Sequence, residues 1–183
     1  MLGENFPRTL DAARIGAQSA WTNLYRDLAP AVLGYLRVRR AREPEDLTGE
    51  VFLQVARDLH RFQGGEQEFR AWVFVIAHHR LLDEGRRTVR RPVDLEPDVT
   101  ALGGAADDVE TQVIESTATE DVRRIIDRLP PDQREVLLLR VFGDLTVEQV
   151  AQAIGKSAGA VKALQRRGVA AVKQALAEEA VPL

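Results

Sequence analysis

The sequence contains no cysteine and few aromatic residues, and it has no long apolar run. Without cysteine, the 183-residue chain forms neither disulfide bonds nor thiolate zinc sites. No apolar stretch approaches the roughly 20 residues that a membrane-spanning helix needs, and the N-terminal residues lack the apolar core of a secretion signal. We therefore expect a cytoplasmic protein. Its length, with 45% hydrophobic and 29% charged residues, suits one globular domain or two small ones.

Charge is distributed unevenly along the chain, although the formal net charge is only -3. Residues 1–91 carry 15 arginines against 12 acidic residues, and residues 122–183 carry 10 basic residues against 7 acidic ones. Between them, residues 92–121 hold 9 acidic residues and neither lysine nor arginine. The prolines and the glycine pair of this connector are typical of an extended linker. Its acidity fits either a solvated spacer or a mimic of nucleic acid that occupies a positively charged channel.

The apolar spacing predicts an all-α fold, because apolar residues recur every three or four positions and do not alternate for long. In the first block we expect helices over about residues 20–39, 45–60 and 67–88. Pro44 suits the first turn of the second helix, and the third helix places Trp72 on a core-facing stripe. We expect two small helical domains joined by a flexible acidic linker, with a tail over residues 1–19, a first domain over 20–91, a linker over 92–118 and a second domain over 119–183.

Two polar segments of the first block allow a structural and a functional interpretation. The loop over residues 60–68 contains Gly64-Gly65, and it is either a plain connection or a surface that reads a ligand between two rigid helices. Residues 86–91 hold four arginines and no acidic residue. Such a run is usually a solvated face, but the repulsion between like charges also favours contact with phosphate.

The sharpest local pattern is TVEQVAQAIGKSAGAVKALQRR, residues 146–167. Thr146 and Gln149 have the spacing of a capping box, Gly155 stands where the chain must turn, and Ser157 is placed to cap a second helix. Ala151 is small where that second helix crosses, and Val161 and Leu164 pack back against the first helix. This pattern is typical of a DNA-binding helix-turn-helix, with an ordinary packed helical hairpin as the alternative.

Charge favours the DNA-binding interpretation, because residues 156–173 contain five basic residues and no acidic one. On the side opposite Val161 and Leu164, small residues near the start of the second helix allow close approach to a major groove. Lys162 and Arg166 then reach base edges or phosphates, whereas Arg167 lies toward the flank as a backbone anchor.

Together these segments resemble one family, the extracytoplasmic-function sigma factors of bacterial RNA polymerase. The matching strings are EPEDLTGEVFLQVARDLHRF, FRAWVFVIAHHRLLDEGRR and LPPDQREVLLLRVFGDLTVEQVAQAIGKSAGAVKALQRR. They follow one another in the family's order. The resemblance implies an alternative sigma factor that binds core polymerase, selects promoters and assists their melting. It also implies a first domain for the start-proximal promoter element and a second domain for the upstream element.

The resemblance assigns residues to three surfaces. The surface that docks on core polymerase comprises Asp46, Leu47, Glu50, Val51 and Phe52. The surface for the start-proximal element, including a pocket for an unstacked base, comprises Phe62, Gln63, Gly64, Gly65, His79, Arg86 and Arg87. The surface for the upstream element comprises Ser157, Ala158, Lys162, Ala163, Arg166 and Arg167. Family members are commonly inhibited by an anti-sigma factor, so we expect one here, and we expect no cofactor, metal or small-molecule substrate.

The sequence departs from the family pattern at three positions. Gly49 replaces a frequent glutamine in the docking helix, at a cost of about 1 kcal/mol against alanine. His78-His79 stands where arginine and asparagine are common, and Leu164 stands where many members have arginine.

Two other function classes compete with this interpretation. A stand-alone helix-turn-helix regulator explains residues 146–167 but leaves the docking string and the acidic connector without a role. An enzyme is disfavoured because the three histidines do not form a chelating set: adjacent helical residues such as His78 and His79 point about 100° apart. The sequence also has no HExxH motif, phosphate-binding loop or nucleophile elbow.

Overall fold

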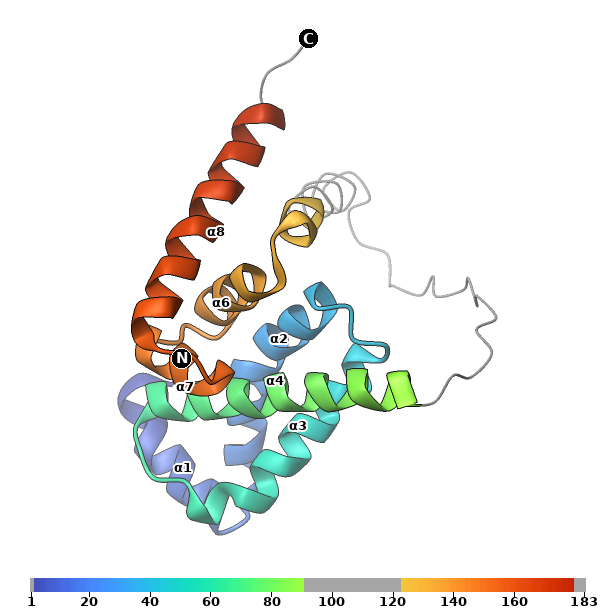
Figure 1. Ribbon diagram of the computed structural model, residues 1–183. Coiled ribbons are helices and arrows are strands. Elements are labelled where there is room, and N and C mark those ends of the chain that lie inside the picture. The colour runs from blue at the N-terminus through green and yellow to red at the C-terminus, as the bar shows by residue number, and fades with distance from the viewer. Residues whose placement is uncertain (1, 91–122, 180–183) are drawn as a thin grey trace, which may run out of the picture.

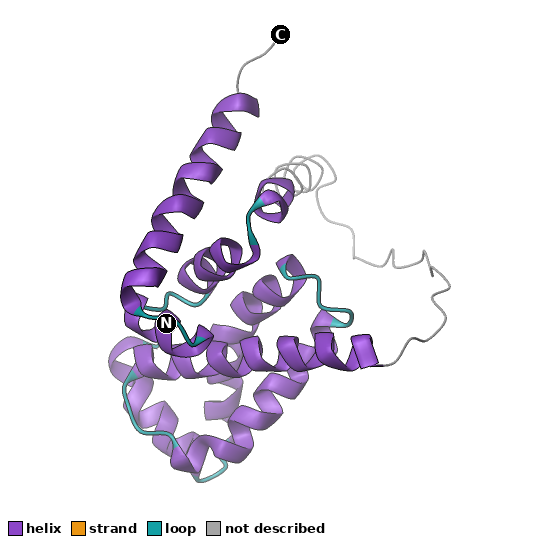
Figure 2. Cartoon of the chain, viewed as in Figure 1, coloured by secondary structure: helices purple, strands orange, loops and turns teal. Residues whose placement is uncertain are grey.

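The computed structural model describes residues 2–90 and 123–179, with side chains over residues 2–86 and 123–178. All regular structure in these ranges is helical (Figure 2). The elements are η1 (Gly3–Asn5), α1 (Phe6–Arg14), α2 (Gln18–Val38), α3 (Pro44–Asp58), η2 (Leu59–Arg61), α4 (Glu66–Arg90), α6 (Pro131–Phe142), α7 (Val147–Ile154) and α8 (Ala158–Glu179). Residues 123–128 are helical as well. We call residues 2–90 the N-terminal module and residues 123–179 the C-terminal module.

The three helices expected in the first block are confirmed by α2, α3 and α4. Pro44 occupies the first turn of α3, where its missing N–H costs no hydrogen bond, and Glu45 and Asp46 follow it at the positive end of the helix dipole. Short 3₁₀-helix η2 then leads into the loop before α4. The helices pack around fully buried side chains such as Tyr35, Phe69 and Phe74.

The expectation of a tail over residues 1–19 is wrong, because this segment contains helix and packs into the core. Phe6, Leu10 and Ala13 follow the i, i+4, i+7 spacing of one helical face, and all three are buried. The Phe6 ring lies 5.5 Å from the Phe69 ring of α4, measured between centroids. The Glu66 carboxylate accepts hydrogen bonds from the backbone N–H groups of Leu2 and Gly3, the second at 2.9 Å. Residues 2–14 therefore belong to the N-terminal module.

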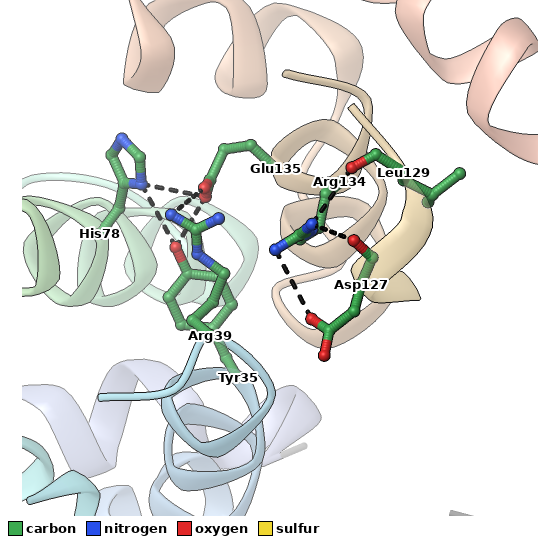
Figure 3. Close-up of polar contacts among 7 residues, drawn as sticks. All are labelled: Tyr35, Arg39, His78, Asp127, Leu129, Arg134 and Glu135. Carbon is green, nitrogen blue, oxygen red and sulfur yellow. Dashed lines mark hydrogen bonds and ion pairs between the residues drawn. The ribbon is translucent and has the colours of Figure 1, made fainter. Parts of the chain in front are cut away.

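In the C-terminal module, α8 crosses α6 at a glycine. A Cβ placed on Gly168 would lie 2.9 Å from a methyl group of Leu137, so a larger residue would push the two helices apart. Residues 123–128 are tied to α6 by Arg134, whose guanidinium bonds the Asp127 side chain at 3.5 Å and the Leu129 carbonyl at 3.1 Å (Figure 3). Ile125 and Leu129 are buried.

The two modules pack against each other in a single body. Helices α6 and α7 lie against α2 and α4 (Figure 1), and one continuous cluster of buried apolar residues extends from Phe6 to Leu164. A Cβ on Gly34 of α2 would lie 2.8 Å from the Phe142 ring of α6, so glycine permits this close approach. The all-α fold is as expected. The linker expected over residues 92–118 lies outside the described residues.

Candidate nucleic-acid interface

The helix-turn-helix expected over residues 146–167 is present, and its end groups have the predicted hydrogen bonds. Thr146 Oγ1 accepts from the Gln149 N–H at 3.2 Å, and Gln149 Oε1 accepts from the Thr146 N–H at 2.8 Å. This reciprocal pair is a capping box that fixes the start of α7. Gly155 ends α7 with φ +67°, the left-handed conformation that glycine adopts without strain. Ser157 Oγ then accepts from the Ala160 N–H at 3.2 Å at the start of α8.

Apolar contacts set the crossing of α7 and α8. Val150 and Val161 are fully buried, and Leu164 is nearly so. Ala151 is also buried, which agrees with the need for a small residue where the helices cross. Leu164, which stands where many family members have arginine, therefore has a packing role here.

The opposite side of α8 presents cations to solvent. Ser157, Gly159, Lys162, Arg166 and Arg167 are exposed, and Ala158 and Ala163 are half-buried beside them. We call these seven residues the recognition face. Lys162 and Arg166 also line a shallow open groove of about 420 Å³ along α8. Lys156 is partly neutralised, because its Nζ lies 2.9 Å from a carboxylate oxygen of Asp132.

The expected polymerase-docking residues on α3 divide into two groups. Asp46 and Glu50 are exposed, and they lie one turn apart on the same face. Leu47, Val51 and Phe52 are buried in the N-terminal module. Their side chains hold α3 against the core in this structure, so Asp46 and Glu50 form the solvent-facing part of the expected docking surface. The Phe52 ring lies 4.7 Å from the Tyr25 ring.

Leu53 is a further docking candidate, which the family pattern did not indicate. It is 60% exposed, which is unusual for a leucine in a packed helix, and it follows Asp46 and Glu50 along one helical stripe. The adjoining turn is ordered by Arg80, whose guanidinium bonds Gln54 Oε1 at 2.8 Å and Glu50 Oε2 at 3.4 Å. The i, i+4, i+7 spacing of these positions was a usable signal.

Fewer residues of the loop before α4 are exposed than expected. Phe62 is buried and stacks on Trp72 with ring centroids 5.2 Å apart, so it supports the loop from below and does not form a pocket edge. Gln63, Gly64 and Gly65 are exposed. Gly64 has φ +146°, and the Gly65 N–H donates to Glu68 Oε2 at 3.0 Å. The exposed part of the loop is thus held in a defined shape.

The remaining start-proximal candidates lie farther along α4. His79 and Arg86 are exposed, and Arg86 forms a loose ion pair with Asp83 at 3.4 Å. The side chain of Arg87 lies outside the described residues. His78, the neighbour of His79, is buried, and the two imidazole rings lie 5.8 Å apart between centroids.

A buried polar cluster, which no sequence pattern predicted, joins the two modules (Figure 3). Its acceptor is Glu135 of α6. Oε1 of Glu135 lies 2.7 Å from the Tyr35 hydroxyl and 3.0 Å from Nδ1 of His78, and Oε2 lies 2.8 Å from the Arg39 guanidinium. We call these four residues the interface cluster. Tyr35 lies in α2, Arg39 directly follows that helix, and His78 lies in α4.

Electrostatics in the interface cluster keep Glu135 charged and Tyr35 neutral. Burial by itself would raise the pKa of Glu135, but the hydrogen bond from His78 and the charge of Arg39 outweigh it, so the pKa lies below the ordinary value. Burial raises the pKa of Tyr35 well above its ordinary value, and the Glu135 charge adds to that shift. The Tyr35 hydroxyl therefore keeps its proton and donates a hydrogen bond to Glu135. Nδ1 of His78 faces two oxygens, Glu135 Oε1 at 3.0 Å and the Tyr35 hydroxyl at 3.2 Å.

An apolar groove of about 660 Å³ opens between α2, residues 123–128, α6 and α8. Val141 at its edge is 74% exposed, and Arg123 and Lys173 are charged residues of its lining. None of the helices that the structure describes has the length and hydropathy to cross a bilayer. Over the same residues we find no group of three or more side chains arranged to hold a metal ion.

Comparisons with known proteins identify the class. Residues 24–91 match the family model "Sigma-70 region 2", and residues 119–172 match "Sigma-70, region 4". The ECF RNA polymerase sigma factor ShbA of Streptomyces griseus subsp. griseus is 33% identical over 174 residues, which cover 90% of this chain and 91% of ShbA. The ECF RNA polymerase sigma factor RpoE of Cereibacter sphaeroides is 30% identical over 161 residues, which cover 86% of each chain.

Solved structures show the same fold. CnrH, in complex with the cytosolic domain of CnrY, aligns with a TM-score of 0.65 at 20% identity and covers 94% of this chain and 97% of its own. The sigma factor RpoE of Bartonella quintana, in complex with the anti-sigma factor NepR, aligns with a TM-score of 0.62 at 19% identity over 85% of this chain and 95% of its own. The fold and helix-turn-helix thus define a sigma-70-type transcription factor. More narrowly, the chain belongs to the extracytoplasmic-function family of RNA polymerase sigma factors, and it is an alternative sigma factor that directs RNA polymerase.

Proposed function

We propose that the two modules of this sigma factor divide the work of promoter recognition. The C-terminal module reads the upstream element as duplex DNA, and the N-terminal module docks on core polymerase and reads the start-proximal element. The observation that carries the proposal is the recognition face of α8: Lys162 and Arg166 are exposed on a helix whose other side is packed against α7. A helix-turn-helix places the N-terminal part of its second helix in a major groove, where these cations meet base edges or phosphates.

For core binding we propose a surface on α3 formed by Asp46, Glu50 and Leu53. Two carboxylates beside an exposed leucine combine charge steering with an apolar anchor. Leu47, Val51 and Phe52 contribute by fixing the orientation of α3. A helix of polymerase that carries basic and apolar side chains would complement this surface.

For the start-proximal element we propose that Gln63, Gly64, Gly65 and His79 contact an extruded base, while Arg86 and Arg87 contact phosphate. Extruding a base costs a few kcal/mol of unstacking, which contacts to the base edge and to the strand offset. The exposed loop backbone and the exposed imidazole support the first role, and the exposed guanidinium of Arg86 supports the second.

We also infer that the protein acts in the cytoplasm, where the chromosome and polymerase are, that it performs no chemistry itself, and that an anti-sigma factor inhibits it. The complexes of Bartonella quintana RpoE with NepR and of CnrH with CnrY support the last inference. The apolar groove beside α8 offers such an inhibitor a surface to cover. Co-expression of candidate inhibitors encoded beside the gene, followed by affinity purification, tests it.

The competing function is a stand-alone helix-turn-helix regulator, and dependence on polymerase separates the two. Fragmented genomic DNA is incubated with the purified protein, with and without bacterial core polymerase, and the retained fragments are sequenced. We expect specific enrichment only with core polymerase, and loss of enrichment when Asp46 and Glu50 are both changed to lysine. Equal enrichment without polymerase would favour the stand-alone regulator.

A further inference from the structure

At the contact between the modules, a carboxylate of the C-terminal module is bound by side chains of the N-terminal module. Three groups of the N-terminal module bind the Glu135 carboxylate: the Tyr35 hydroxyl at 2.7 Å, Nδ1 of His78 at 3.0 Å and the Arg39 guanidinium at 2.8 Å (Figure 3). Glu135 is 7% exposed and His78 is 5% exposed. A buried carboxylate is tolerated only when it is paired and hydrogen-bonded, so the C-terminal module has a buried charge that the N-terminal module stabilises.

Two further contacts join the two modules near the interface cluster. Arg70 of α4 donates to the carbonyl groups of Phe142 at 2.7 Å and Gly143 at 2.9 Å, which are acceptors that the end of α6 leaves without helical partners. Gly34 of α2 lets the Phe142 ring approach closely. Arg70, Phe74 and His78 follow one another at four-residue intervals, so a single stripe of α4 faces the C-terminal module.

The closed arrangement places the N-terminal module beside the helix-turn-helix. When a helix-turn-helix binds a duplex, its first helix crosses the DNA backbone while the second lies in the groove. Here the first helix, α7, packs against α4 (Figure 1). The N-terminal module therefore occupies space next to the helix that a bound duplex must pass. The sequence allows the modules to part, because the 32 residues of 91–122 have a maximum reach of about 110 Å.

We propose that the interface cluster is an autoinhibitory latch that holds the two promoter-reading modules closed in the free protein. Opening the latch separates the modules so that each can bind its own promoter element. The contact between the modules also has an apolar part, because one cluster of buried apolar residues runs through both of them. Its polar part lowers the cost of separation, because water can solvate all four groups once the modules part. The consequence for promoters rests on the proposed function, but the latch itself does not.

The test is a distance measurement in the full chain. Because the protein has no cysteine, single cysteines at two exposed positions, Ser19→Cys in α2 and Ala177→Cys in α8, take a fluorescent donor and acceptor. Single-molecule energy transfer then reports the separation of the modules. The first latch variant is Glu135→Gln, which removes the charge at constant size. Its matched control is Glu148→Gln, at an exposed glutamate of α7.

The second latch variant opens the same contact by a different physical route. Gly34→Leu favours the α2 helix but places a side chain where the Phe142 ring lies. Its matched control is Gly85→Leu in α4, where an added Cβ has no neighbour within 4 Å. Circular dichroism checks that the helix content of all four variants is unchanged, and if Glu135→Gln fails to fold then Gly34→Leu decides the test.

We expect wild type and both controls to give one narrow population at a single transfer efficiency, that of the closed form. In Glu135→Gln the ratio of open to closed molecules rises about tenfold, because charge-assisted hydrogen bonds are replaced by weaker neutral ones. In Gly34→Leu the ratio rises as well, because the added side chain overlaps the Phe142 ring of the closed form. Closed populations in both latch variants, or controls that open as far as they do, would overturn the latch. Core polymerase is added last: it should open the wild type. If the latch variants open yet polymerase leaves every protein unchanged, the proposed function fails and the latch stands.

Discussion

The recognition face allows a prediction in which loss of DNA binding is separated from loss of stability. Lys162→Ala and Arg166→Ala each remove one exposed cation from α8. Alanine has the highest helix propensity, and exposed substitutions of this kind change the free energy of unfolding by no more than about 0.5 kcal/mol. We therefore expect both variants to unfold at the wild-type temperature.

The expected effect on binding is much larger. A side chain that contacts a base edge in the major groove discriminates by about 1–3 kcal/mol, which corresponds to about 5- to 150-fold in affinity. The control is Lys173→Ala, which removes the same charge from the same helix. Lys173 lies seven residues beyond Arg166, about 10 Å farther along the axis, so it is outside the turns that enter a groove.

The assay is fluorescence anisotropy with the sigma factor assembled on core polymerase and a labelled promoter duplex. Lys162→Ala and Arg166→Ala should each weaken binding to the intact promoter by this factor. Scrambling the upstream element should not weaken the binding of these variants any further. Binding to core polymerase should be unchanged. Equal losses for Lys173→Ala, or a parallel loss of polymerase binding, would refute the assignment of α8 as the reading helix.

Three further predictions concern stability and phosphate contact. The lowered pKa of Glu135 means that its charged form stabilises the folded protein above about pH 4.5, and that this contribution is lost as the pH falls through the folded-state pKa. The difference in unfolding free energy between wild type and Glu135→Gln, measured with urea, should therefore shrink toward low pH. Thr146→Ala removes the cap of α7 and should cost about 1 kcal/mol, which lowers the Tm by about 2–4 °C, whereas Thr22→Ala within α2 should not. Arg86→Gln should weaken DNA binding across sequences and reduce the salt slope by about one, with little change in stability because its ion pair with Asp83 is exposed.

Each of these expectations has a clear counter-result. A Glu135→Gln difference that stays constant from pH 7 to pH 3 would mean that the carboxylate is not selectively stabilised in its charged form. An unchanged Tm in Thr146→Ala would show that tertiary packing, and not the capping box, fixes the start of α7. A loss confined to one promoter sequence in Arg86→Gln would mean that Arg86 reads bases.

The helix-turn-helix was predictable from sequence because its determinants are local. Thr146 and Gln149 are three residues apart, and Gly155 alone supplies the left-handed turn. Val161 and Leu164 then pack on residues of the preceding helix. Every contact lies within one short stretch of chain, so spacing and residue type determine it.

Positions on α3 were harder to assign because a resemblance transfers residues without their orientation. The family pattern named Leu47, Val51 and Phe52 beside Asp46 and Glu50, but only a three-dimensional structure shows which of them face the core. For α1 the residue spacing was informative, but the prediction did not use it. Phe6, Leu10 and Ala13 had the spacing of a buried helical face, but the short segment before the family pattern was expected to be a tail.

The interface cluster could not be predicted from local pattern. Tyr35 and His78 are 43 residues apart, and Tyr35 and Glu135 are 100 residues apart. Each of these residues by itself resembles an ordinary surface or core position. Their common function arises only because α2, α4 and α6 meet, which no period or motif in a single segment records.

Run-off transcription with purified bacterial core polymerase tests the central claim most directly. The template carries a promoter recovered by the DNA-retention experiment, and the control template has its upstream element scrambled. We expect a transcript of defined length only when core polymerase and this protein are both present, with strongly reduced yield from the scrambled template and from Arg166→Ala. A template that core polymerase fails to transcribe from a defined start in the presence of this protein would contradict the account.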